Sequence, residues 1–400
     1  MLVLVIYAGL VVTTSFSAGR QFLGSTLSSF LPDITIDQPQ LTAAGNIYAE
    51  RVTLEDTKGE WLAVQQAAIR WSPLALLVGS LDVHEIAAQQ VMLARLPEAT
   101  ETTTEEPPAS EETGLSLPFS SIELKQLQVS EVTLPAEIAG MPAQFMIDGS
   151  AAYSSTPEKI TGQINITRFG EIQGSASLDV DFAPADSIFN FRAIVSEAAN
   201  GLAAHVLDLQ GAPSFALRME GGGPLSDWTS SLQVDLNNAR AIEGDVTLAQ
   251  SGSQKTLTTN LSGELAQFLP ATASSLFAGQ TSWFAIATLN ESYLPLSAQA
   301  KLSTGTIVLQ MENDYSADGG ALIAKVQAQT IEGSNRPLQF VTDGQVIGLG
   351  SFALNATASG PLENLNWDLS ANASQLATQD VDLDRLLLEQ KVMERRYLSS

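Results

Sequence analysis

Apolar residues that recur two apart constrain this chain more than any other feature of its sequence. The stretch from Gly59 to Leu96 shows the pattern most clearly. Its apolar pairs are Leu62/Val64, Ile69/Trp71, Leu81/Val83 and Val91/Leu93. A period of two is that of a β-strand with one buried face. Because Pro73 opens and Gly79 closes a short apolar turn in the middle, the stretch predicts strand, strand, short helix, strand, strand.

The alternation continues downstream, where clusters of Gly, Pro, Asn, Asp or Ser separate short apolar runs. Between Ile122 and Leu134 its phase slips by one residue twice, at Lys125-Gln126 and at Ser130-Glu131. Slips of this kind predict β-bulges within a continuing strand. In this part of the chain, helices are predicted only at residues 199–209, 264–277, 373–378 and 383–397. The chain is therefore predicted to be mainly β.

Composition excludes several classes of function. The 400 residues include 44 acidic and 19 basic ones, for a net charge of -25. Nucleic acid is excluded as a partner, because its phosphates need basic side chains, and so is docking to an anionic membrane through a basic patch. The absence of cysteine excludes disulfides, thiolate nucleophiles and cysteine-ligated metals. Since 16% of residues are charged and 6% aromatic, the balance favours extended, repetitive β architecture.

The sequence offers no convincing catalytic or metal-binding constellation. Its two histidines, His84 and His205, lie in separate segments, so we interpret them as surface or hydrogen-bonded residues rather than as a metal pair. No serine stands in a Gly-x-Ser-x-Gly elbow. The three glycines at 221–223 lack the lysine of a phosphate-binding loop. We therefore expect no enzymatic activity, no bound metal and no cofactor.

The two ends and one internal segment differ from the alternating pattern. Residues 1–12 are apolar and the first charge is Arg20, so residues 1–22 predict either a single-pass membrane anchor or a cleaved signal peptide. Residues 97–113 hold six glutamates and three prolines without a basic or large apolar residue, which predicts a disordered acidic linker. Residues 381–400 predict a C-terminal helix, with Arg395-Arg396 in its last turn.

One unit of sequence recurs 137 residues further along, as counted from Phe215 to Phe352. The first copy runs Ser214-Phe-Ala-Leu217, Gly223-Pro224-Leu225, Trp228, and the second runs Ser351-Phe-Ala-Leu354, Gly360-Pro361-Leu362, Trp367. Each copy predicts a hairpin in which Gly-Pro interrupts the sheet and the tryptophan packs over the turn.

Two of these features resemble one protein family. Gly59, Trp61 and Leu62, followed by Trp71-Ser-Pro-Leu-Ala-Leu-Leu77, Gly79 and Leu81, resemble the start of the AsmA-like superfamily. The resemblance is greatest to TamB, the family of inner-membrane components of the translocation and assembly module. The two Gly-Pro-Leu…Trp units are similar to repeats of that family. Because the family's characteristic C-terminal region is missing, we expect a truncated copy, a fragment or a shorter relative.

The resemblance implies both a fold and a role. The fold would be a long, curled, antiparallel-rich sheet, a β-trough or β-taco, with a few short helices and an N-terminal membrane helix. Residues 23–96 would form its AsmA-like N-terminal β region and residues 114–380 its repetitive trough. The role would be phospholipid transfer and support of outer-membrane protein assembly or secretion. Such a protein is anchored in the inner membrane, has its bulk in the periplasm and has an outer-membrane barrel as partner.

In a trough, the apolar face of the strands would line a groove open to acyl chains instead of packing on a second sheet. Alternation alone does not distinguish these two architectures. The candidate groove residues are strongly apolar positions on the predicted strands: Phe182, Phe191, Phe215, Leu217, Leu232, Val234, Ile307, Leu309, Phe352 and Leu354. If a facing layer closes that side, the alternative function is an exported structural or adhesive β-repeat protein without lipid cargo.

Overall fold

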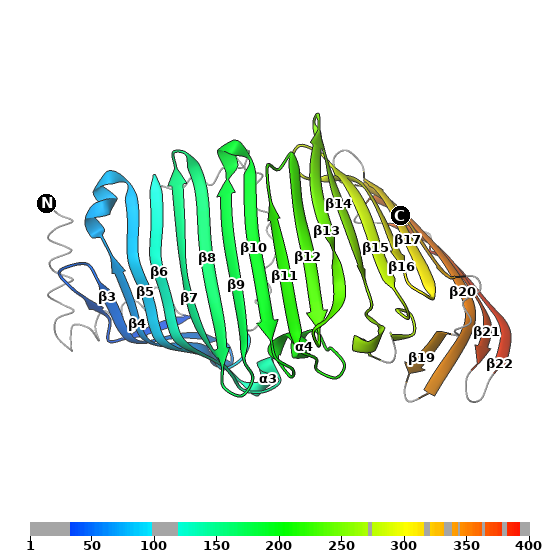
Figure 1. Ribbon diagram of the computed structural model, residues 1–400, viewed down its shortest axis with the longest axis horizontal. Coiled ribbons are helices and arrows are strands. Elements are labelled where there is room, and N and C mark those ends of the chain that lie inside the picture. Colours follow the sequence, from blue (N-terminus) through cyan, green and yellow to red (C-terminus); the bar gives the residue numbers. More distant parts are fainter. Residues whose placement is uncertain are drawn as a thin grey trace, which may run out of the picture. The chain divides into compact units, whose positions relative to one another are not determined.

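The computed structural model describes residues 33–97, 119–270, 274–315, 321–331, 338–342, 345–361, 365–377 and 382–392. These residues are mainly β, with long and mostly antiparallel strand pairing and a few short helices (Figure 1). The chain divides into two compact units. Unit 1 takes its described residues from 1–186 and 191–205, and unit 2 takes them from 187–190 and 206–400.

Unit 1 consists of strands that pair with their neighbours in chain order. Its elements are β1 Ile34–Asp37, β2 Gln40–Leu41, β3 Ile47–Asp56, β4 Gly59–Trp71, η1 Pro73–Val78, β5 Ser80–Leu93, β6 Ser121–Leu134, α3 Ala136–Ala139, β7 Ala143–Ser155, β8 Glu158–Phe169, β9 Gly174–Ala183, η2 Pro184–Asp186 and most of β10 Ile188–Glu197. β3 pairs with β1, β2 and β4, and the later strands follow side by side, as Figure 1 shows for β5 to β9. β5 and β6 pair in parallel, which the long connection between Leu93 and Ser121 permits.

The stretch from Gly59 to Leu96 forms two long strands around one helical turn. The predicted turn is confirmed: η1 is a 3₁₀ helix with Pro73 in its first turn, and Gly79 ends it in the left-handed conformation, with φ 73°. The four predicted strands merge in pairs into β4 and β5. Within β4, Gln66 has a φ of 50° and no Cα partner on either side, so one residue absorbs the change of phase.

Both predicted bulges in β6 are confirmed. The register of β6 against β7 shifts between Leu124 and Leu127 and again between Val129 and Val132. These are the places where the apolar phase slips in the sequence. Since a one-residue change of register moves side chains to the other face of a sheet, each bulge returns the apolar residues of β6 to their original face.

Unit 2 is a run of antiparallel strands. Its elements are α4 Leu202–Val206, shared with unit 1, then β11 Phe215–Gly222, β12 Asp227–Leu236, β13 Ala239–Ser251, β14 Gln254–Gly263, η3 Ala266–Phe268, β15 Thr281–Leu289, β16 Pro295–Ser303, β17 Ile307–Tyr315, β18 Ala321–Thr330, β19 Leu338–Thr342, β20 Gln345–Pro361, β21 Asn366–Ala377 and β22 Asp382–Val392. Consecutive strands pair from β11 to β18. The long β20 pairs with β19 through its first part, with β18 through its second part, and with β21, which pairs with β22.

The repeated sequence unit forms two hairpins, as predicted. β11 pairs with β12 and β20 pairs with β21. Gly223 and Gly360 take nearly the same unusual φ, 124° and 126°. The tryptophans differ, however. Trp228 is buried, stacks on Phe189 with ring centroids 5.9 Å apart and donates from Nε1 to the Phe189 carbonyl at 2.9 Å, whereas Trp367 is 51% exposed.

Two helix predictions are wrong. Residues 382–392, predicted as part of a C-terminal helix over 381–400, form β22 and pair with β21. Residues 373–377, also predicted as helix, lie inside β21. Pairing along the exposed side of a neighbouring strand outweighs the helical propensity of these segments. The helices predicted at 199–209 and 264–277 shrink in the described residues to α4 and η3.

Some predictions concern residues outside the described ranges. These are the anchor or signal at 1–22, nearly all of the acidic linker at 97–113, and the end of the C-terminal helix beyond Val392. In the part of the chain that is described, no helix is long and apolar enough to cross a membrane. The pairing of β5 with β6 places the sequence before and after the acidic segment in the same unit.

The left-handed glycine of the first hairpin yields a test. We expect Gly223→Ala to lower the free energy of unfolding by about 1–3 kcal/mol, because other residues are strained at this φ. Its Cβ would also lie 3.3 Å from the Asp227 carbonyl oxygen. Gly162→Ala is the control, since the nearest atom to its Cβ would be 3.9 Å away and its φ is ordinary. Urea denaturation measures the free energy of unfolding of both variants. Equal losses of stability in the two variants would contradict the hairpin geometry.

Candidate functional site

The strand register of unit 2 gathers the apolar residues on one face of the sheet. Directly paired residues of neighbouring strands point to the same side. Leu302 pairs with Leu309, Leu309 with Ala328, Ala328 with Leu354, and Leu354 with Ala371. The same holds at the start of unit 2, where Phe215 pairs with Leu236, Leu217 with Val234 and Met219 with Leu232. We call this side the apolar face of unit 2.

The opposite face of unit 2 is polar. Lys301 pairs with Gln310, Gln310 with Gln327, Gln327 with Asn355, and Asn355 with Ser370. Large apolar side chains interrupt this pattern in the described residues: Phe284, Ile323 and Leu387 are exposed, and Ile286 and Val308 are half-buried. The sheet is thus amphipathic. Its polar face is stable in water, whereas its apolar face is stabilised by contact with an apolar partner.

Unit 1 has an apolar face of the same kind. Val64 pairs with Val91, Val91 with Val132, and Val132 with Phe145. Further along, Tyr153 pairs with Ile160, and Ile160 pairs with Phe182. The bulges of β6 and the irregularity at Gln66 preserve this alignment, because they correct the phase of the side chains where the register would otherwise bring polar residues to the face.

The ten candidate groove residues all lie on strands, and the register places nine of them on an apolar face. Phe182 belongs to the face of unit 1. The eight candidates that belong to unit 2 lie on the apolar face of that unit: Phe215, Leu217, Leu232, Val234, Ile307, Leu309, Phe352 and Leu354. Phe191 lies in β10. Val234 and Ile307 are each only 8% exposed and therefore contact protein rather than a ligand, whereas the other eight are half-buried.

Half-burial along the apolar face distinguishes this sheet from a closed sandwich. In a sandwich, side chains of the two inner faces interdigitate and become almost inaccessible. Here Leu302, Leu309, Val326 and Leu354 keep an intermediate exposure, as do the alanines between them. In the described part of unit 2, buried apolar residues lie toward both ends of the strands: Val234, Leu236 and Phe268 at one end, and Trp228 and Leu248 at the other. Among the described residues, most side chains in the middle of the face are therefore only partly covered.

A small core closes one edge of the unit 2 face. Its buried members are Val234, Leu236, Ala241 and Phe268, where Phe268 comes from η3. Leu209, Phe215, Leu217, Leu232, Ile242 and Leu265 pack against them. Four of the candidate groove residues, Phe215, Leu217, Leu232 and Val234, thus belong to a protein core at this edge, which sequence alternation does not reveal.

A second closure lies further along the same edge. Thr304 and Thr306, both buried, follow β16, and their hydroxyls donate to the Leu276 carbonyl at 2.6 and 2.8 Å. The Thr306 hydroxyl also lies 3.0 Å from the Ser275 carbonyl. These bonds hold the segment around Leu276 against the edge and account for the burial of Ile307.

A buried ion pair closes one edge of the unit 1 face. Arg168 at the end of β8 pairs with Glu197 at the end of β10, and their side chains are 3% and 8% exposed. The other Glu197 oxygen, Oε2, accepts from the Ala203 backbone N–H of α4 at 2.8 Å. The guanidinium also lies 5.8 Å from the ring centre of Phe145. The pair therefore fastens α4 to the sheet, and α3 lies at the same edge (Figure 1).

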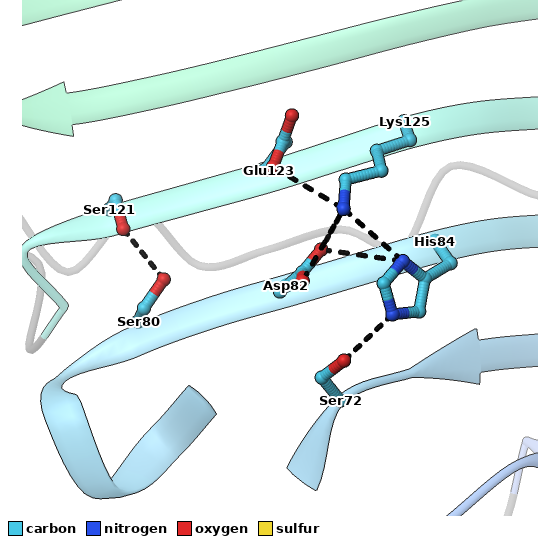
Figure 2. Close-up of polar contacts among 7 residues, drawn as sticks. All are labelled: Ser72, Ser80, Asp82, His84, Ser121, Glu123 and Lys125. Carbon is cyan, nitrogen blue, oxygen red and sulfur yellow. Dashed lines mark hydrogen bonds and ion pairs between the residues drawn. The ribbon is translucent and has the colours of Figure 1, made fainter. Parts of the chain in front are cut away.

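A polar cluster occupies the other edge of unit 1, beside η1. Figure 2 shows His84 between Ser72, Asp82 and Lys125. The His84 Nε2 lies 2.7 Å from the Ser72 hydroxyl, and its Nδ1 lies 3.3 Å from the Lys125 ammonium and 3.7 Å from Asp82 Oδ1. The combination of serine, histidine and aspartate resembles a catalytic triad in composition.

The hydrogen bonds of this cluster do not activate the serine. An ammonium can only donate, so Nδ1 of a neutral His84 must accept from Lys125, and Nε2 then carries the proton and donates to Ser72. A general base needs the opposite tautomer, with Nδ1–H held by the carboxylate. Lys125 instead approaches Asp82 Oδ1 at 3.1 Å. The cluster is best described as a charge-paired network that ties β5 to β6 and to the start of η1.

The buried ion pair gives a stability prediction. Removing one partner, as in Arg168→Met or Glu197→Gln, leaves an uncompensated buried group, and we expect a loss of about 3–5 kcal/mol in the free energy of unfolding. The double variant Arg168→Met/Glu197→Met should lose less than either single variant. The rate of hydrogen exchange at the Ala203 backbone amide should rise in both single variants and in the double variant.

The matched control for this prediction is the solvent-exposed pair Lys159–Asp181. Lys159→Met should change the urea midpoint far less than either single change in the buried pair, because exposed ion pairs contribute little. If Lys159→Met and Arg168→Met were equally harmful, the assigned role of the buried pair would be refuted.

Comparison with known proteins adds no family to this description. No protein-family model, curated protein or solved structure matches the chain. The function must therefore be argued from the two apolar faces, their closed edges and the charge of the chain.

Proposed function

We propose that this protein binds phospholipid acyl chains along its apolar faces and moves lipid in support of envelope biogenesis. The observation that carries the proposal is the in-register apolar face of unit 2, half-buried through its middle and polar on its reverse side. Each buried methylene of an acyl chain would contribute about 0.8 kcal/mol. No side chain is required to act as a catalyst, and no cofactor enters the proposal.

The side chains in the middle of this face leave room for such a ligand. Ala285 pairs with Ala300, and Ala287 pairs with Ala298. A methyl group stands much lower above a sheet than a leucine, so alanines flanked by larger residues form a shallow depression across the strands. An acyl chain lying in it would contact aliphatic side chains on both sides without displacing a protein layer.

The apolar face of unit 2 is also long enough to hold acyl chains. Pairing from β11 to β18 and on through β20 to β22 makes ten strand-to-strand steps, and at about 4.8 Å each they extend roughly 48 Å. One leaflet contributes about 15 Å, half of the roughly 30 Å hydrocarbon core of a bilayer. Several acyl chains can therefore be accommodated in succession along unit 2 alone.

The cellular setting is proposed from the sequence resemblance to TamB. We place the chain in the inner membrane through a single-pass N-terminal anchor, with its bulk in the periplasm and an outer-membrane barrel as partner. The trough shape, the support of outer-membrane protein assembly or secretion, and phospholipid as the cargo belong to the same proposal. The net charge of -25 is compatible with it, because the binding described here is apolar and needs no basic patch.

The alternative is an exported structural or adhesive β-repeat protein without lipid cargo. The closed edges favour it, since the cores around Phe268 and around Arg168 show that parts of both faces are covered by the chain itself. Fractionation separates the two proposals: recovery in the inner membrane supports the first, and recovery in the medium supports the second.

Photocrosslinking tests the lipid proposal directly. A photoreactive residue in place of Leu309 or Leu354 should give lipid adducts detectable by mass spectrometry after expression of the full chain. The matched controls are the sequence neighbours Gln310 and Asn355, which lie on the opposite face and should give none. Absence of lipid adducts at both leucine positions, or equal adducts on both faces, would refute the proposal.

Charge placed on the apolar face should block lipid binding without unfolding the sheet. We expect Ala300→Asp to reduce lipid transfer between vesicles about tenfold or more, because a carboxylate beside an acyl chain loses its water. Gln299→Asp, one residue away on the polar face, should leave the rate unchanged. Circular dichroism verifies that both variants keep their strand content, and equal rates in the two variants would contradict the prediction.

A further inference from the structure

A single charged side chain lies on the apolar face of unit 2. In β14, Lys255 lies two residues before Leu257 and pairs with Leu289 of β15, and Leu257 pairs with Ala287. Residues two apart on a strand point to the same face, so Lys255 shares the face of Leu257. Within the described strands β11 to β18, the pairing places no other charged residue on this face. A charge at this position therefore requires an explanation.

The ammonium of Lys255 has no carboxylate within ion-pair distance among the described residues. It donates to the Glu291 backbone carbonyl at 2.8 Å and lies 3.3 Å from the ring centre of Tyr293. These contacts hold the ammonium in place but leave its charge without a counter-ion, because a carbonyl and an aromatic ring carry only partial negative charge. An ammonium has three N–H donors, and the carbonyl takes one of them. Donors therefore remain for an anion.

Composition does not account for this unpaired charge. The chain has 44 acidic residues against 19 basic ones, so carboxylates are plentiful. Glu291 itself contacts Lys255 through its backbone carbonyl and forms no ion pair with it in the part of the chain that the structure describes. The surroundings of Lys255 thus position a cation without neutralising it.

The turn between β15 and β16 holds Tyr293 against this lysine. Tyr293 has a φ of 61°, in the left-handed region that bulky residues rarely adopt. The Asn290 backbone N–H donates to the Leu294 carbonyl at 2.9 Å, and the Asn290 side-chain oxygen accepts from the Leu294 N–H, also at 2.9 Å. Backbone strain of this kind persists only where the surrounding structure holds it, and it is concentrated at functional sites. The turn therefore places the aromatic ring before any ligand arrives.

The position of Lys255 suits the polar end of an amphiphile. β14 runs from Lys255 toward the edge that Phe268 closes, so the lysine stands at the other end of the strand. There Leu257, Ala287 and Leu289 keep an intermediate exposure. Two residues of a strand span about 7 Å, which is the distance along β14 from Lys255 to the row of Leu257 and Ala287. A lipid whose tail lies over the alanines would thus bring its headgroup within reach of the ammonium.

We infer that Lys255, held by Tyr293 and the Glu291 carbonyl, binds the phosphate group of a phospholipid whose acyl chains lie over the alanines of the unit 2 face. A phosphate is anionic and offers several acceptor oxygens, and a hydrogen bond between two charged groups is stronger than one between neutral groups. The inference rests on the proposed function, because the phosphate is the anionic group of the ligand proposed there. It adds the residue that recognises the headgroup and a preference over uncharged lipids.

Two lipids with the same acyl chains test the site. The purified full chain is titrated by calorimetry with dioctanoyl phosphatidylglycerol and with dioctanoylglycerol, which lacks the phosphate. The phospholipid should bind about tenfold more tightly or more, as expected for a hydrogen bond to a charged group. Lys255→Gln should remove this preference and leave the affinity for dioctanoylglycerol unchanged, which also verifies that the variant is folded. Lys255→Arg, which keeps the charge, should keep the preference.

The matched control is Lys301→Gln. Lys301 is a second lysine without an ion pair among the described residues, but it lies on the polar face, where it pairs with Gln310. This variant should keep the full preference for phosphatidylglycerol. A preference that survives Lys255→Gln, or that is lost equally in both variants, would overturn the inference.

The titrations of the unsubstituted protein separate this inference from the proposed function. Equal affinity for the two lipids would refute the phosphate site and support lipid carriage. Binding of neither lipid would refute the proposed function, and the phosphate site with it. Inorganic phosphate alone should bind at least about tenfold more weakly than phosphatidylglycerol, because it lacks acyl chains. Equal affinity for inorganic phosphate would make Lys255 a site for a free anion and would also overturn the inference.

Discussion

Preservation of side-chain phase across neighbouring strands is the constraint on which the rest of this structure depends. A strand has only two sides, so an apolar face extends across a sheet only if every pairing keeps the same parity of residues. β5 and β6 illustrate the point: Val83 pairs with Leu124 and Ile86 with Leu127, so both strands advance by three residues, an odd step, at the same place. The irregularities of unit 1 are thus corrections that keep its apolar face intact.

An apolar face of this extent has to be covered by something, and the described residues of the chain cover it mainly at its edges. Phe268 and the segment around Leu276 close one edge in unit 2, and the Arg168–Glu197 pair holds α4 over an edge in unit 1. The alanine-rich middle of unit 2 has no such cover among the described residues. Acyl chains are a suitable cover, because they are apolar, flexible and able to leave. The distribution of closures therefore defines where a ligand could lie.

Much of this architecture follows from local sequence. Period-two alternation predicts the strands, phase slips predict the bulges of β6, and Pro73 with Gly79 predicts η1, because each feature depends on a few adjacent residues. What the sequence does not predict depends on distant partners. Arg168 and Glu197 are 29 residues apart, and no pattern links them. Trp228 is buried because Phe189 lies beside it, and β22 forms because β21 offers a free side for pairing.

The accessibility of the apolar face in the absence of lipid tests the account most directly. Since the chain has no cysteine, Ala300→Cys can be probed with an apolar maleimide in lipid-free folded protein and again after lipid is added. The account predicts rapid modification of the folded protein and protection by phospholipid. A thiol that stays unreactive until the protein is unfolded would show that a protein layer seals the face, and would contradict the account.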